Sequence, residues 1–138
     1  MQQKYYLDTS IWIDYLEDRK DRIRPLGEFA FQFLKKCKKE KAKIIVLDIV
    51  LKELRKQMPE EKIQTMLSDF YDLIVKLKHT EKQFNEADNL WEKNNKEFPL
   101  ADILHSIIAK DENAILMSRD KHFNEIGIAK EYLPEELI

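Results

Sequence analysis

The sequence predicts an α/β protein in which a parallel β-sheet is covered by helices on both faces. Short apolar runs that favour strands alternate along the chain with longer segments whose apolar residues recur at helical spacing. The run Ile44–Leu47 is apolar at every position, as expected for a strand buried on both faces of a parallel sheet. With 138 residues, 43% of them hydrophobic, the chain is long enough for one sizeable core, and we expect a single domain spanning residues 1–138.

The N-terminal part is expected to fold as strand, helix, connection and helix. Lys4–Leu7 is a β-prone run, and Asp8–Ser10 contains three residue types that favour the start of a helix. The helix continues through Ile11–Leu16, and the charged stretch Glu17–Arg24 is expected to be a connection. Pro25 then opens a helix with apolar residues at helical spacing.

The middle of the chain is expected to contain one strand and two helices. Ile44–Leu47 is the strand, and Asp48 is expected to cap a helix that runs to about Met58. From Pro59 the apolar residues keep helical spacing as far as Leu77, which predicts one long helix.

The C-terminal part is expected to add helices and the remaining strands. Thr80 is expected to cap a helix that extends through Trp91, and Pro99 precedes a helix over Leu100–Lys110. Ala114–Met117 is predicted to be a strand, and Ile128–Tyr132 could form a last edge strand.

Charge is unevenly distributed along the chain. The net charge is −2, but residues 17 to 43 contain ten Lys or Arg and only five Asp or Glu. A cationic segment of this kind suits a polyanionic substrate. The alternative is that its lysines only solvate the end of a helix, where positive charge also favours the helix dipole.

Four acidic residues are distinguished by their positions, namely Asp8, Glu53, Asp102 and Asp120. Asp8 and Asp120 each follow a predicted strand, and Asp102 lies in the first turn of its helix. Each of these three can be explained as a helix cap or as a carboxylate favoured by the helix dipole. Glu53 lies within a helix on an apolar stripe, so it needs a partner or a position at the rim of the core.

Taken together, the four acids predict a divalent-metal site. Ligand crevices in parallel α/β sheets lie at the carboxyl ends of the strands. Asp8 and Asp120 fall just past such ends, and Glu53 follows Ile44–Leu47 by about a turn and a half of helix. Carboxylates gathered at one edge repel each other unless cations lie between them, and oxygen ligands suit Mg²⁺ or Mn²⁺.

Cysteine and histidine usage gives little support for thiolate or imidazole metal sites. Cys37 is the only cysteine, so an internal disulfide is impossible and a reducing compartment is expected. The three histidines lack a ligand-like spacing. His105, three residues after Asp102, could reach the site, but a satisfied histidine on a helix is the simpler explanation. No signal peptide opens the chain and its apolar runs are too short to span a membrane, so we expect a cytoplasmic protein.

The acids fall within sequence blocks that have a characteristic order. These are Tyr6–Ile11 (YLDTSI), a Glu within a helix, Pro99–Ala109 (PLADILHSIIA) and Leu116–Phe123 (LMSRDKHF). The arrangement resembles the PIN-domain family, in particular the small ribonuclease toxins of VapBC-type toxin–antitoxin pairs. The resemblance covers the whole chain, and its last two blocks are the specific part.

This resemblance implies a three-layer α/β/α sandwich with a short parallel sheet, and Mg²⁺- or Mn²⁺-dependent cleavage of RNA. It assigns the catalytic, metal-binding acids to Asp8, Glu53, Asp102 and Asp120. Glu53 is anchored only by its helix and spacing. Thr9 and Ser118 stand where the family has hydroxyl groups, which would steady a carboxylate or a metal-bound water. Asn124 stands near the position at which some relatives carry a further acid, so a fifth ligand is not expected.

The implied reaction is hydrolysis by an activated water that attacks phosphorus in line and leaves 5′-phosphate and 3′-hydroxyl ends. It needs no 2′-hydroxyl nucleophile, so the fold does not exclude DNA. Candidate RNA phosphate contacts outside the pocket are Arg19, Arg22, Arg24 and Lys35. The resemblance also implies a small antitoxin partner that covers the acidic pocket, and a homodimer.

Two other functions compete with this interpretation. A PIN-like module could bind RNA or a protein without cutting, although the presence of all four acids argues against loss of the site. Phosphotransfer through an aspartyl nucleophile at Asp8 usually requires a second Asp two residues later, where Ser10 stands.

Overall fold

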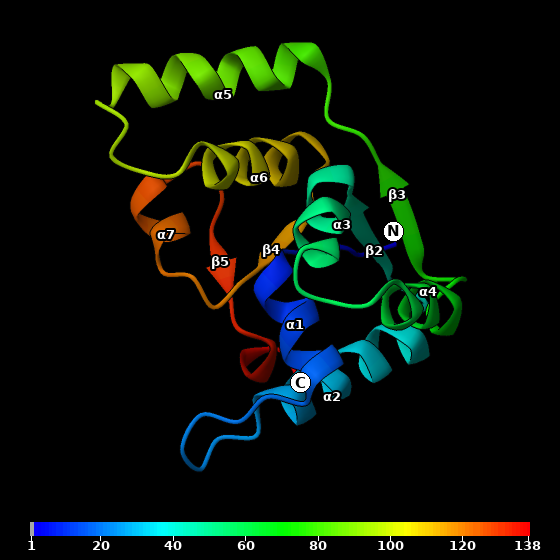
Figure 1. Ribbon diagram of the computed structural model, residues 1–138. Helices are drawn as coiled ribbons and strands as arrows, with labels where there is room; N and C mark the ends of the chain where they lie inside the picture. Colours follow the sequence, from blue (N-terminus) through cyan, green and yellow to red (C-terminus); the bar gives the residue numbers. More distant parts are fainter. Residues whose placement is uncertain (1) are drawn as a thin grey trace.

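The computed structural model, which describes residues 2–138, confirms the predicted fold class (Figure 1). Five parallel strands form one sheet in the order β3-β2-β1-β4-β5. The strands are β1 (Lys4–Leu7), β2 (Lys43–Leu47), β3 (Ile74–Leu77), β4 (Ile115–Met117) and β5 (Glu131–Tyr132). The helices are α1 (Thr9–Glu17), α2 (Leu26–Glu40), α3 (Asp48–Arg55), α4 (Glu60–Asp69), α5 (Glu81–Lys93), α6 (Leu100–Asp111) and α7 (His122–Ile126), followed by the 3₁₀ helix η1 (Pro134–Glu136).

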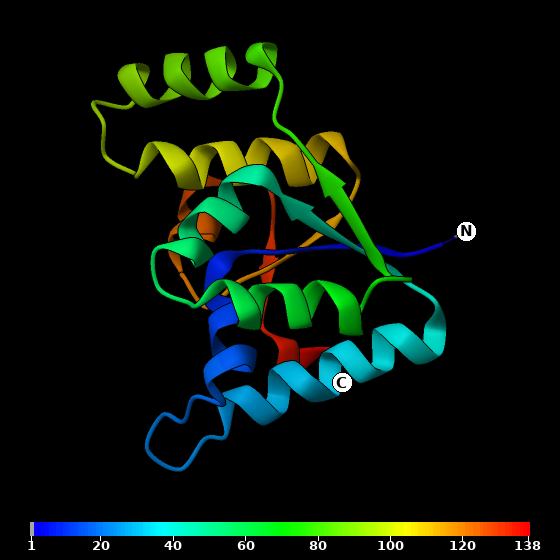
Figure 2. The same ribbon diagram turned by 45° about the vertical axis from the view of Figure 1, so that its right-hand side comes forward.

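Helices cover both faces of the sheet. Helices α5 and α6 lie on one side, and α2 and α4 lie on the other, in both views of the molecule (Figures 1 and 2). The expected three-layer α/β/α arrangement is therefore confirmed. In this arrangement β1 occupies the centre of the sheet, between β2 and β4.

The core follows the apolar pattern of the sequence. The residues Ile44–Leu47 are buried, as predicted for a strand covered on both faces. Helix α2 buries Phe33 and Leu34, and helix α6 buries Ile107 and Ile108, so each contributes one apolar stripe to a side of the sheet. The residues that follow the strand ends are thereby held on well-packed elements.

The long helix predicted from Pro59 to Leu77 is wrong. Helix α4 ends at Asp69, and Ile74–Leu77 is the edge strand β3, paired with β2 in register Ile44↔Ile74 to Leu47↔Leu77. The apolar spacing in this stretch fits a helix as well as a turn followed by a strand. Pairing with β2 decides the outcome, because β2 would otherwise expose its backbone hydrogen-bonding groups along one side.

Three smaller expectations also need correction. The cap of α3 is Leu47 rather than Asp48, and the Asp48 carboxylate accepts a hydrogen bond from the backbone N–H of His79, beyond the end of β3. Helix α3 ends at Arg55, short of Met58. The last strand covers only Glu131–Tyr132 of the expected five residues, because only these two positions pair with β4.

The cationic connection after α1 forms a loop that projects from the body of the molecule (Figure 1). Within it, Asp21 and Arg24 exchange backbone hydrogen bonds and also form an ion pair. Ile23 beside them is 96% exposed. Among residues 2–138 there is no helix with the length and apolar character needed to cross a bilayer.

Candidate metal centre at the carboxyl edge of the sheet

The carboxyl ends of β1 and β4 are joined directly, which brings the residues that follow them together. The backbone N–H of Asp8 donates to Met117 O at 3.1 Å, and that of Ser118 donates to Tyr132 O at 3.1 Å. Three neighbouring strands therefore end in one hydrogen-bonded row. This is the edge at which parallel sheets bind ligands.

Asp8 is buried at this edge and fully engaged in hydrogen bonds. Its Oδ1 accepts from the backbone N–H of Ser10 at 3.0 Å and from Ser10 Oγ at 2.5 Å, and its Oδ2 accepts from Ser118 Oγ at 2.6 Å. Burial raises the pKa of Asp8, while the hydrogen bonds from Ser10 and Ser118 act against that rise. Asp8 is thus the N-cap of α1, as predicted. Its hydrogen bond from Ser118 also links it to the residue that follows β4.

Asp102 and Asp120 come together from α6 and from the loop between β4 and α7. Ligand atoms of Asp102, Asp120 and His122 all lie within 4.8 Å of one another. His122 Nδ1 is 3.2 Å from Asp120 Oδ1 and 3.5 Å from Asp102 Oδ2. Burial and the negative charge of Asp120 raise the pKa of Asp102, as expected for two carboxylates that share one site.

Ser118 connects Asp8 with Asp120. Its Oγ donates to Asp8 and accepts from the backbone N–H of Asp120 at 2.9 Å. The residue is only 1% exposed, and its hydroxyl fixes one acid side chain and the backbone of another. This is the supporting contact expected for Ser118.

Glu53 approaches the same edge from α3 through a second group of contacts. Thr9 Oγ1 donates to Glu53 Oε2 at 2.9 Å, the supporting contact expected for Thr9. Glu53 Oε1 lies 3.3 Å from Nε2 of the buried His105. Burial alone raises the pKa of Glu53, but the contact and charge of His105, together with the Thr9 hydrogen bond, hold that pKa below its usual value.

His105 has a structural role that the sequence did not reveal. Its Nδ1 is 2.5 Å from the hydroxyl of Tyr6 on β1, and its Nε2 faces Glu53, so it lies between the central strand and the acid. His105 is therefore a helix histidine whose ring nitrogens have partners, as expected, and one of those partners is an acid of the candidate site. The spacing of three from Asp102 was the available signal, because residues three apart share a helix face.

A largely buried arginine holds the loop that carries Ser118 and Asp120. Arg119 Nε donates to Asp14 of α1 at 2.5 Å, and its two terminal nitrogens donate to Glu135 of η1 at 3.0 and 2.9 Å. Its backbone N–H donates to Ser10 Oγ at 3.3 Å, so the loop is tied to α1 and to the C-terminal segment. Charge pattern alone could not identify these contacts, since Asp14 is 105 residues away along the chain and Glu135 is 16 residues away.

A further acid lies beside this edge. Burial, and next the negative charge of Asp120, raise the pKa of Glu131 on β5 to about 7. Glu131 lines a hollow of about 420 Å³ that also includes Ser118 and Asn124. Nothing in the sequence distinguished Glu131 from an ordinary edge-strand residue.

The predicted phosphate contacts lie at the other end of α1 or on α2, and all are exposed. Arg19 pairs with Glu17, and Arg24 pairs with Asp21. The nine-residue helix α1 separates this loop from Asp8 by roughly 13 Å, from its rise per residue. The structure therefore keeps the three arginines of this loop away from the acidic cluster itself.

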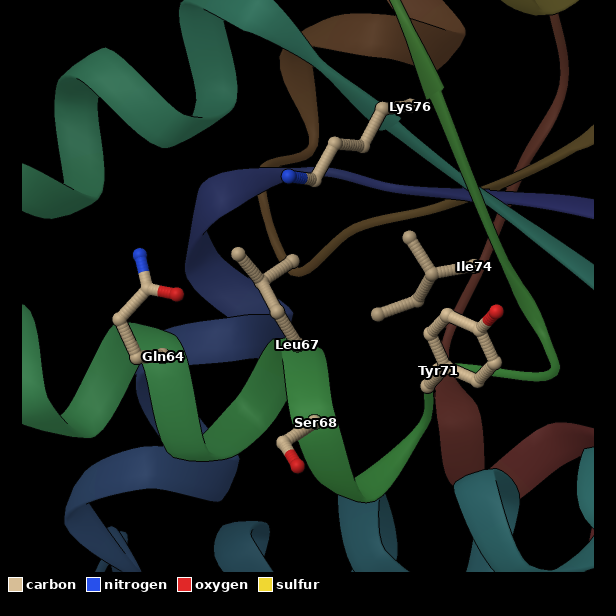
Figure 3. A pocket seen from close by; sticks show the side chains of 6 residues that line it. All are labelled: Gln64, Leu67, Ser68, Tyr71, Ile74 and Lys76. Atoms are coloured by element: carbon tan, nitrogen blue, oxygen red, sulfur yellow. The ribbon is translucent and has the colours of Figure 1, made fainter.

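A larger hollow lies elsewhere on the molecule. It has a volume of about 630 Å³ between α4 and β3, and its lining includes Leu67, Tyr71, Ile74 and Lys76 (Figure 3). Among residues 2–138, no acidic side chain lines it. The candidate site is consequently identified by its chemistry and not by the size of a cavity.

The donor set fits a divalent cation. Asp102 and Asp120 supply oxygen ligands whose mutual repulsion a cation would relieve, which agrees with the raised pKa of Asp102. His122 adds an imidazole nitrogen, which Mn²⁺ tolerates better than Mg²⁺ does. Asp8 and Glu53 lie outside the three-residue group, but Ser118 links Asp8 to Asp120, and Thr9, the residue after Asp8, holds Glu53 by a hydrogen bond.

Comparisons with known proteins agree with this architecture. A family model described as "PIN domain" matches residues 5–129. The comparison with curated proteins found no matching sequence.

Several solved structures share the fold. VapBC2 from Rickettsia felis, bound to a DNA fragment from its promoter, aligns with a TM-score of 0.70 at 21% identity, covering 95% of this chain and 98% of that one. VapBC-1 from nontypeable Haemophilus influenzae gives a TM-score of 0.67 at 16% identity, covering 96% and 99%. VapC20 from Mycobacterium tuberculosis, a sarcin–ricin loop cleaving toxin, gives 0.64 at 14% identity, covering 89% and 95%.

Proposed function

Because the chain belongs to the PIN-domain family, we propose that it is a divalent-metal-dependent endoribonuclease and the toxin of a toxin–antitoxin pair. The observation that carries the proposal is the group formed by Asp102, Asp120 and His122, linked through Ser118 to Asp8. That VapC20, which has the same fold, cleaves the sarcin–ricin loop supports RNA as the substrate.

In this proposal Asp8, Glu53, Asp102 and Asp120 together hold Mg²⁺ or Mn²⁺. A divalent cation supplies Lewis-acid activation of water and neutralises charge at the scissile phosphate. Ser118 and Thr9 fix the carboxylates of Asp8 and Glu53 in place before any ligand arrives, so little reorganisation is needed. Burial and the negative charge of Asp120 raise the pKa of Asp102, and a bound cation would relieve that repulsion.

The proposed phosphate contacts are Arg19, Arg22, Arg24 and Lys35. Arg22 and Lys35 form no ion pair within residues 2–138, whereas Arg19 and Arg24 would exchange an acidic neighbour for phosphate. Neutralising Arg22 or Lys35 should make the plot of log RNA affinity against log salt concentration less steep, by about one unit of slope for each phosphate interaction that is removed. An unchanged slope in both variants would remove this loop and helix from the RNA interface.

The proposed function is tested by incubating the purified protein with end-labelled RNA in Mg²⁺, in Mn²⁺ and in chelator. Cleavage should require the cation and should be lost in Asp8→Asn and Asp120→Asn. Asp72→Asn is the matched control, because Asp72 is exposed and lies two residues before β3, at the opposite end of that strand from the acidic edge. Metal-dependent RNA binding without cleavage, across a varied RNA panel, would favour the non-catalytic binding module instead.

We further propose an antitoxin partner, which the VapBC complexes among the structural neighbours support, and we propose that the chain forms a homodimer. Light scattering on the isolated chain should give twice the mass of 16.6 kDa. Co-expression with a small protein encoded beside it should abolish cleavage. A monomeric protein whose activity no neighbouring gene product affects would contradict both parts.

A further inference from the structure

A groove beside the acidic edge has a lining that the proposed cleavage chemistry does not use. It lies between the α5–α6 connection and α7, which are close together in Figure 1, and has a volume of about 600 Å³. Its apolar lining includes Leu90, Phe98 and Ile126. The volume falls within the range of small-ligand pockets.

The polar part of this groove consists mainly of hydrogen-bond acceptors. Glu97 and Glu125 are exposed, and neither side chain forms an ion pair or hydrogen bond within the described part of the chain. Asn94 uses its amide N–H₂ on Leu90 O at 2.8 Å, which leaves its carbonyl oxygen available. No Lys or Arg of residues 2–138 lines the groove, so it repels phosphate and suits a ligand that carries N–H donors.

The groove adjoins the metal centre through Phe98. The ring centroids of Phe98 and His122 are 6.1 Å apart, and His122 belongs to the group with Asp102 and Asp120. Glu125 follows His122 by three residues on α7, so both lie on one face of that helix. A ligand that contacts Phe98 in the groove would therefore lie on the side of the Phe98 ring next to His122, near a phosphate bound at the acids.

We propose that the groove binds one unpaired base of the RNA substrate, with guanine the preferred base; this rests on the proposed ribonuclease function. Single-stranded RNA is recognised through splayed bases that contact aromatic rings and are hydrogen-bonded on their Watson–Crick edges. Guanine presents an N1–H and an amino group side by side, which match the two oxygens of one carboxylate. Uracil presents a single N–H on that edge. Charge would then orient the bound nucleotide, with its phosphate at the cation-binding acids and its base at Glu97 and Glu125.

Binding of free nucleosides tests the groove without any metal or cleavage. Methyl signals of Ile126 and Ile128 are followed by NMR while guanosine, inosine or uridine is added to the wild-type protein. Guanosine should shift these signals saturably, inosine should bind more weakly because it lacks the amino group, and uridine should bind at least about fivefold more weakly than guanosine. The double variant Glu97→Gln/Glu125→Gln should lose the guanosine preference, because each amide offers one acceptor where a carboxylate offered two.

The matched control is Glu92→Gln, on the same helix α5 but outside the groove, where Glu92 pairs with Lys96. It should bind guanosine as the wild type does. Equal responses to guanosine and uridine would overturn the proposal. The proposal would also be overturned if N-acetylarginine amide shifted the methyl signals and none of the nucleosides did. That result would assign the groove to a protein partner.

Cleavage of short RNAs that differ at one base supplies the second measurement. Replacing the recognised guanine by uracil should lower kcat/KM by about tenfold in the wild type and much less in the double variant. A protein that cleaves with no dependence on any flanking base would overturn the groove proposal and leave the ribonuclease intact. A protein that binds guanosine but never cleaves would refute the ribonuclease and leave the groove as a base-binding site.

Discussion

Replacing Arg119 by Met should destabilise the protein strongly, because it removes the cation from a largely buried cluster of charges. The Arg119 side chain is 15% exposed, and its guanidinium lies against the side chains of Asp14, which is 4% exposed, and Glu135, which is 20% exposed. Removing one partner of a buried ion pair costs about 3–5 kcal/mol, since the remaining charge is left without compensation. Because Glu135 can reach water, we expect a loss of about 3 kcal/mol, at the lower end of this range.

Urea unfolding followed by circular dichroism measures this loss. With an m-value of about 2 kcal/mol/M, the midpoint should fall by about 1.5 M. The loss of stability in Arg119→Met should also depend on pH. Burial raises the pKa of Asp14, and the Arg119 contact acts against that rise. Without Arg119 the pKa of Asp14 rises further above its unfolded value, so the variant loses stability as the pH rises above about 4.

The control is Arg55→Met, which removes an exposed pair with Glu60 that is also held by two hydrogen bonds. Its midpoint should change far less, because exposed pairs contribute little. Equal midpoint shifts for Arg119→Met and Arg55→Met would show that the buried charges do not depend on Arg119. So would a loss of stability in Arg119→Met that does not shrink at low pH.

Three further variants test the remaining electrostatics. Asp102→Asn should raise the Tm of the metal-free protein by on the order of 3 °C, because it removes a carboxylate whose pKa is raised by burial and by Asp120. The variant should also show a smaller Tm increase with Mn²⁺ than the wild type does. A lower Tm without metal would contradict this. Glu131→Gln should stabilise the protein at pH 8 and not at pH 4. A carboxyl group with a pKa of about 7 in the folded protein costs stability when it ionises, as the pH rises through the interval from 4.5 to 7. The gain in the free energy of unfolding, after solvent screening, should be on the order of 1 kcal/mol by urea unfolding. Tyr6→Phe should lower the free energy of unfolding by about 1–2 kcal/mol, because it leaves His105 Nδ1 buried without its partner. An unchanged free energy of unfolding would show that the contact is not a hydrogen bond.

Much of the fold could be predicted because local and tertiary preferences agree along most of the chain. Lys4–Leu7 and Ile44–Leu47 have apolar character suited to buried strands and are followed by helix-starting residues. The failure at Ile74–Leu77 has a definite cause. An apolar spacing that fits a helix also fits a turn and an edge strand, and only the position of β2 decides between them.

The acidic site was predictable to the extent that strand ends and helix faces position its members. Asp8 and Asp120 follow strands that turn out to be neighbours in the sheet, so their approach follows from topology. Contacts between distant segments were not predictable in the same way. The Tyr6–His105 and Arg119–Glu135 contacts depend on the packing of α6 and η1 against the sheet, for which no local signal exists.

The most direct test of the central claim is an anomalous-scattering map from crystals grown with Mn²⁺. We expect one or two peaks at the carboxyl edge of the sheet, bounded by Asp102, Asp120 and Asp8, and we expect them to disappear in crystals of Asp120→Asn. Absence of a peak at this edge in wild-type crystals at saturating Mn²⁺, or a peak that persists unchanged in the variant, would contradict a metal-dependent nuclease site at these acids.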